Sequence, residues 1–103
     1  MDIERTQTGN GILFSFTGSF SGIDKATVHL FGTILADIEK KPAEIVFNME
    51  KAAFFDSMAV GLLVGILLKC KEKGIPIRIE KISQNMRTIL DMTRLNKAFP
   101  QLY

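Results

Sequence analysis

The sequence predicts an α/β fold in which a mixed β-sheet of about four strands packs with three or more helices. Two strand-like runs flank a Gly-Asn-Gly turn, and two long segments repeat apolar residues at helical spacing. Two further short runs have strand character, so the expected order is β-β-α-β-α-β-α. The 103 residues suffice for one core, and we expect a single domain over residues 1–103.

The first two strands are expected at residues 3–7 and 12–17, on either side of Thr8-Gly9-Asn10-Gly11. Glycine and asparagine accept positive φ, which favours a β-hairpin here. Gly18 is expected to end the second strand.

The first helix is expected from Asp24 to about Lys40, because Ser21-Gly22-Ile23-Asp24 has the Ser-x-x-acid form of a helix start. Lys40, Lys41 and Pro42 end it. Its apolar positions at helical spacing are Val28, Phe31, Ile34, Leu35 and Ile38.

Residues 44–49 form an almost continuous apolar run, which predicts a strand covered on both faces. A second helix follows the Asp56-Ser57 junction and runs to about Lys73, where Gly74 ends it. Its core stripe is expected to comprise Ala59, Leu63, Ile66, Leu67 and Cys70.

Residues 75–79 alternate and predict a strand, with Pro76 tolerated near its start. Ser83 is expected to cap a third helix, followed by a short packed tail. The apolar or aligned positions of these last segments are Met86, Ile89, Leu90, Thr93, Leu95, Ala98 and Phe99.

The amino-acid composition and the distribution of charge argue against some classes of function. Hydrophobic residues make up 47 % and charged residues 23 %, and scattered basic residues leave a net charge of +2. This is typical of a folded domain and offers no basic face for nucleic acid. The longest apolar run, residues 58–68, is well short of the roughly 20 residues that span a bilayer. Without a secretory signal at the N-terminus, a cytoplasmic protein with no direct membrane insertion is expected.

Catalytic and metal-binding residues are not evident. Cys70 is the only cysteine and is expected to be a buried structural thiol. His29 is the only histidine and has no cysteine or paired carboxylates nearby. We therefore expect no enzyme activity, no metal and no cofactor.

The junction between residues 44–49 and the second helix is the most informative site. A helix N-terminus carries partial positive charge and tolerates an anion. Ser57 could cap the helix, with Asp56 competing for that role, or it could accept a phosphate. The residue types leave both interpretations open.

The same helix has an unusual outer side. Ser57, Gly61, Val64 and Leu68 fall opposite the core stripe, where charged side chains are normally found. An exposed apolar stripe predicts a partner-docking surface, although another part of the fold or a second copy of the chain could cover it.

These motifs resemble the STAS domain, the family of anti-sigma-factor antagonists and related regulatory modules. Phe55-Asp56-Ser57-Met58-Ala59-Val60-Gly61 is similar to the family's Asp-Ser-(Ser/Thr/Ala)-Gly-Leu-Gly, and residues 89–99 are similar to its Leu-x-x-Thr-Gly-Leu-x-x-x-Phe ending. The chain departs from the pattern at Met58-Ala59, at Arg94 in place of glycine, and at Gly18-Ser19-Phe20-Ser21 in place of Gly-Glu-Leu-Asp.

The resemblance implies partner switching. The unphosphorylated chain would bind a serine kinase that also serves as an anti-sigma factor, and that kinase would phosphorylate Ser57. A metal-dependent phosphatase of the PP2C type would reset the switch. The implied partner-binding residues are Ser21, Asp56, Ser57, Met58, Gly61, Val64 and Leu68.

A second function is compatible with the same resemblance. The chain could be a STAS subunit docked on an ATP-binding-cassette transporter, such as a lipid importer. Ser57 would then be a helix cap or a contact, and the apolar helix side would lie against the ATPase.

Overall fold

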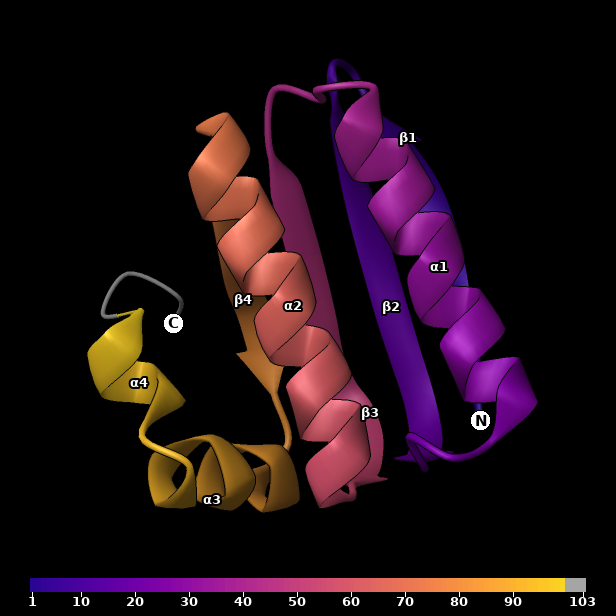
Figure 1. Ribbon diagram of the computed structural model, residues 1–103, viewed down its shortest axis with the longest axis vertical. Helices are drawn as coiled ribbons and strands as arrows, with labels where there is room; N and C mark the ends of the chain where they lie inside the picture. The colour runs from indigo at the N-terminus through magenta and orange to yellow at the C-terminus, as the bar shows by residue number, and fades with distance from the viewer. Residues whose placement is uncertain (100–103) are drawn as a thin grey trace.

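The structure is a computed structural model that describes residues 1–99, and it has the predicted α/β architecture (Figure 1). Residues 100–103, which the sequence analysis includes in the single domain, lie outside the described part. The elements in chain order are β1 (Asp2–Thr8), β2 (Gly11–Phe20), α1 (Lys25–Glu39), β3 (Ile45–Phe55), α2 (Ser57–Lys73), β4 (Ile77–Ile82), α3 (Gln84–Met92) and α4 (Leu95–Ala98).

The four strands form one mixed sheet in the order β1-β2-β3-β4. β1 and β2 pair antiparallel, whereas β3 lies parallel to both β2 and β4. The connection from β2 to β3 through α1 and the connection from β3 to β4 through α2 both lead toward the β4 edge of the sheet. Because such crossovers are almost always right-handed, both helices fall on the same face. Figure 1 shows α1 and α2 side by side over that face, with α3 below the end of β4, where it packs against the end of β3, and α4 to the side of β4.

The expectation that residues 44–49 form a strand covered on both faces is correct only in part, because α1 and α2 both lie on one face although Val46 on the other face is also buried. On the face away from α1 and α2, the side chains of Thr17, Glu50 and Arg78 are exposed. Val46 also lies on that face but is only 6 % exposed. Its neighbours on the adjacent strands, Leu13 and Arg78, flank it and account for its burial.

The core lies between the sheet and the two helices and is rich in phenylalanine. Phe16 and Phe47 pack edge to face with ring centroids 4.9 Å apart, and Phe20 lies 5.0 Å from Phe55. The predicted core stripe of α2 is confirmed, because all five of its residues are fully buried. One of them is Cys70, and burial raises the pKa of its thiol to about 11, so it remains protonated.

Two strands extend further than predicted. Gly18 does not end β2; it adopts φ +91° within the strand, next to a register shift between β2 and β3. Such a β-bulge lets pairing continue, here as far as Phe20 opposite Phe55. β3 thus reaches the start of α2 with a single residue, Asp56, between them.

The start of α1 also differs from the prediction. Asp24 is the N-cap, and its carboxylate accepts a hydrogen bond of 2.9 Å from the Ala26 amide. Ser21 is therefore not a helix cap. Val28 and Leu35, which were expected in the apolar stripe of α1, are 47 % and 39 % exposed.

Among the later elements, β4 begins two residues later and ends three residues later than the predicted strand at residues 75–79, whereas the helix ends and caps agree with the prediction. Gly74 ends α2 with φ +70°, and Ser83 caps α3. Arg94 precedes α4 with φ +61°, a conformation that favours the glycine of the family pattern. Met86, Leu90 and Leu95 are buried, whereas Thr93 and Ala98 are exposed and do not join the packed side.

Candidate functional site

The candidate site lies where the loop between β2 and α1 meets the first turn of α2. Asp56 is the N-cap of α2, and its Oδ1 accepts a hydrogen bond of 2.8 Å from the Ala59 amide. This satisfies one of the amides that a helix N-terminus leaves without an intrahelical partner.

The same carboxylate also binds the β2–α1 loop. The Gly22 amide donates to Oδ1 at 3.0 Å, and the Ser21 hydroxyl donates to Oδ2 at 2.8 Å. The Asp56 amide in turn donates to the Phe20 carbonyl at 3.2 Å. We call the Asp56 carboxylate with Ser21, Gly22 and Ala59 the Asp56 latch. It joins two segments that lie 35 residues apart in the chain.

These donors favour the charged form of the carboxylate. Hydrogen bonds from the Gly22 amide, the Ala59 amide and the Ser21 hydroxyl hold the pKa of Asp56 below its usual range. All three donors are uncharged, so the latch retains a negative charge at the positive end of α2.

Gly22 is required by the close approach of the loop to α2. A Cβ at this position would collide with Met58 Cβ and would lie 2.5 Å from the Met58 carbonyl carbon and 2.7 Å from the Ala59 nitrogen. Sequence reasoning missed Gly22, because a glycine before a helix gives no local sign of a contact so distant in the chain.

Ser57 is the first residue of α2 and is exposed. Because Asp56 performs the capping, the interpretation of Ser57 as the helix cap is wrong. Across residues 1–99, no hydrogen bond from the Ser57 hydroxyl is observed. The hydroxyl is thus accessible, at a helix N-terminus, and has no structural task.

The outer side of α2 continues from Ser57. We use the name α2 face for Ser57, Gly61, Val64 and Leu68. Gly61 is exposed, Val64 is half-buried and Leu68 is 53 % exposed. Val64 packs against the core, so residues 1–99 cover part of this face, and its predicted outward position is only partly correct. Ser57, Gly61 and Leu68 remain exposed. Asp56 is the only charged residue from Phe54 to Leu68.

The other predicted site residues lie at the latch. Ser21 is half-buried with its hydroxyl directed to Asp56, and Met58 is 55 % exposed. The structure thus groups the predicted residues into the latch and the α2 face. Their role in partner binding stays a prediction.

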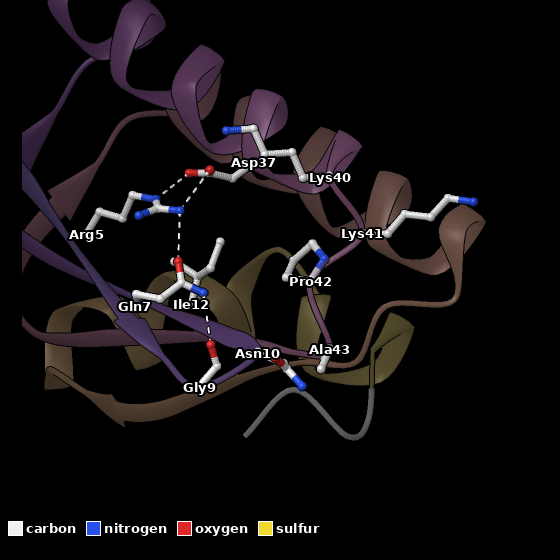
Figure 2. Close-up of a pocket in the computed structure, with 10 residues that line it drawn as sticks. All are labelled: Arg5, Gln7, Gly9, Asn10, Ile12, Asp37, Lys40, Lys41, Pro42 and Ala43. Atoms are coloured by element: carbon white, nitrogen blue, oxygen red, sulfur yellow. Dashed lines mark hydrogen bonds and ion pairs between the residues drawn. The ribbon is translucent and has the colours of Figure 1, made fainter.

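A pocket of about 450 Å³ lies at the other end of the sheet, between the β1–β2 turn and the C-terminal end of α1 (Figure 2). Three of its polar side chains, those of Arg5, Gln7 and Asp37, bind one another. Arg5 Nε lies 2.8 Å from Asp37 Oδ2, and Arg5 Nη2 donates to Asp37 Oδ1 at 3.1 Å and to Gln7 Oε1 at 3.2 Å. The hydrogen bond to Asp37 raises the pKa of Arg5. This pocket therefore contains a structural joint between β1 and α1.

Across residues 1–99, no three His, Cys, Asp or Glu side chains are placed to hold a metal ion. Within the same residues, no helix has both the length and the apolar character needed to cross a bilayer.

The fold and the site together define a small α/β domain that presents a serine at the start of a helix, beside an uncharged helix side. The family model for the STAS domain matches residues 2–103, and the chain belongs to this family. No curated protein sequence matches the chain significantly.

Solved structures with the same fold include those of two anti-sigma factor antagonists, one of them in two forms. The antagonist from Mycobacterium paratuberculosis has a TM-score of 0.79 at 20 % identity, covering 96 % of this chain and 82 % of that one. The Bacillus cell fate determinant SpoIIAA in its phosphorylated form has a TM-score of 0.72 at 19 % identity, with 93 % and 86 % covered. Unphosphorylated SpoIIAA has a TM-score of 0.68 at 18 % identity, with 88 % and 83 % covered.

Proposed function

We propose that this protein is an anti-sigma-factor antagonist that acts by partner switching through Ser57 and the α2 face. The unphosphorylated chain binds a serine kinase-type anti-sigma factor in the cytoplasm. Phosphorylation of Ser57 releases the chain, and a PP2C-type phosphatase restores it. The observation that carries the proposal is the accessible Ser57 hydroxyl, which has no capping role because Asp56 is the N-cap.

The position of Ser57 suits a reversible phosphate. A phosphoserine adds about −1.5 to −2 charges, which a helix N-terminus accommodates well. The fold should therefore tolerate the modification. The same charge lies next to the α2 face, where a partner must remove water from Gly61 and Leu68. Burying an unpaired phosphate against an apolar surface is unfavourable, so the modified chain should dissociate.

The chain takes part in this reaction as a substrate. Its Ser57 oxygen attacks the γ-phosphorus of ATP while the bond from that phosphorus to the β,γ-bridging oxygen breaks, the serine proton passes to a base of the kinase, and ADP leaves. The kinase supplies the nucleotide and the catalytic groups. The chain itself needs neither a cofactor nor enzyme activity. Solved structures of SpoIIAA in phosphorylated and unphosphorylated forms show that this fold exists in both states in that protein.

A paired pull-down tests the proposal. Tagged wild type and Ser57→Asp serve as baits in lysate of the native organism, with Thr88→Asp as a control that adds the same charge on exposed α3. We expect wild type and Thr88→Asp to retain a serine kinase, and Ser57→Asp to retain at least about tenfold less. Mass spectrometry identifies the retained proteins.

Two results would contradict the proposal. One is a kinase that binds Ser57→Asp as tightly as wild type. The other is an ATP-binding-cassette ATPase or permease retained equally by every bait, which would indicate a STAS subunit of a transporter.

A further inference from the structure

We propose that the kinase recognises the surroundings of Ser57 through an apolar rim made by Ile23 and Met58, and that its docking cleft is apolar rather than basic. This inference rests on the proposed function. Ile23 is 76 % exposed and Met58 is 55 % exposed, although both are large hydrophobic side chains. They come from two elements, the β2–α1 loop and α2, that meet beside Ser57.

The rim is held in a fixed geometry by the Asp56 latch. Ile23 directly follows Gly22, whose amide donates to Asp56 and whose Cα packs against Met58. The Ser21 hydroxyl adds a second bond from the same loop. The two backbone segments that carry Ile23 and Met58 are thus held together before a partner arrives, which lowers the entropy lost on binding.

Charge near the rim is nearly absent. Residues 18–23 and residues 57–68 contain no charged side chain. The Asp56 carboxylate accepts three hydrogen bonds and is engaged inside the latch. The next charges along the loop are Asp24 and Lys25, which have opposite signs, and the Asp24 carboxylate caps α1. The two carboxylates at this place are already bonded, Asp24 to the Ala26 amide and Asp56 inside the latch, so a basic cleft would have to compete with these bonds. An apolar cleft would instead bury Ile23 and Met58.

This assignment predicts a specific kinetic pattern. Removing either apolar side chain should weaken docking without changing the chemistry at Ser57. Binding of an uncharged surface should also depend little on salt, because screening acts on charged pairs.

The test uses the kinase that the wild-type chain retains, purified, and measures transfer of phosphate from ATP to Ser57 as the concentration of the chain varies. The variants are Ile23→Ser and Met58→Ser. Met92→Ser is the matched control, because Met92 is 77 % exposed at the end of α3.

We expect Ile23→Ser and Met58→Ser each to raise KM by about tenfold or more, with kcat within about twofold of wild type. Met92→Ser should leave both constants unchanged. KM of the wild type should change by less than about threefold between about 0.05 and 0.5 M NaCl.

The inference is overturned if both rim variants keep the wild-type KM, or if salt raises KM by more than about tenfold. Phosphate transfer to Ser57→Ala at the wild-type rate has a different meaning. It would overturn the proposed function itself, and the inference with it.

Discussion

Asp37 and Asp56 each tie two segments together, but they do so with different partners and at opposite ends of the sheet. Asp37 on α1 is 7 % exposed and pairs with the guanidinium of Arg5 on β1. Asp56 accepts hydrogen bonds from two backbone amides and one hydroxyl. Asp37 is thus stabilised by a cationic side chain, whereas Asp56 is stabilised by uncharged donors.

This difference explains why residues 54–68, which include Ser57, contain no charged residue except Asp56. Because uncharged donors and the helix N-terminus stabilise Asp56, no lysine or arginine has to lie beside it. Residues 52–68 thus contain no lysine or arginine that would hold a phosphate on Ser57 in an internal salt bridge. The Arg5–Asp37 joint, in contrast, neutralises its own charges and only connects elements.

Among substitutions at the Asp56 end of the sheet, Gly22→Ala should lower the stability of the protein most. The new methyl group would collide with Met58, and overpacking of this kind costs about 1–3 kcal/mol. For a domain of this size we expect Tm to fall by roughly 5–20 °C. Thermal unfolding followed by circular dichroism measures the change.

Gly61→Ala is the matched control for that variant. A Cβ at Gly61 meets no heavy atom within 4 Å, and alanine favours a helix interior over glycine by about 0.5–1 kcal/mol. Tm should therefore rise slightly. If Gly22→Ala behaved like Gly61→Ala, the loop and α2 would not be in the tight contact described above.

At the other end of the sheet, Asp37→Asn should lower Tm in low salt. The variant removes the charge that pairs with Arg5, but the Arg5 side chain is 43 % exposed, so solvent already screens part of the interaction. The difference from wild type should shrink in about 0.5 M NaCl. A deficit that is independent of salt would indicate that packing, rather than charge, gives Asp37 its role.

The contribution of the Asp56 latch to the free energy of unfolding should depend on pH. Its donors lower the pKa of Asp56 in the folded state, so its contribution is complete above the ordinary carboxyl pKa of about 4 and disappears as pH falls through the folded value. Urea unfolding should show that Asp56→Asn is less stable than wild type at neutral pH. The gap between the two proteins should close on acidification, and a constant gap would contradict this account.

The smallest expected effect is that of Ser57→Ala. Its hydroxyl makes no observed contact among residues 1–99, and exposed substitutions usually change stability by less than about 0.5 kcal/mol. Tm should stay within about 3 °C of wild type. A larger loss, comparable to that of Asp56→Asn, would mean that Ser57 has a structural task after all.

Sequence reasoning succeeded where a local rule applies. The core stripe of α2 follows from the 3.6-residue period, and the end of that helix follows from Gly74. Asp56 and Ser57 were correctly placed at the start of α2, because a strand ends and an amphipathic pattern begins there.

It failed where two distant segments decide the outcome. Ser21 has the spacing of a helix cap, yet its hydroxyl binds Asp56, which lies 35 residues away. Gly18 looks like a strand end, yet the partner strand allows a bulge and pairing continues. The apolar run at residues 45–49 suggested two covered faces, but strand order places both crossover helices on one face.

The strand order affects how the protein can fold while it is being synthesised. Position in the sheet repeats position in the chain, from β1 to β4. As synthesis proceeds, each new strand finds its neighbour already made, and none has to insert between two earlier strands. The sheet can therefore grow at one edge while the ribosome is still translating, with β4 as the last strand to join.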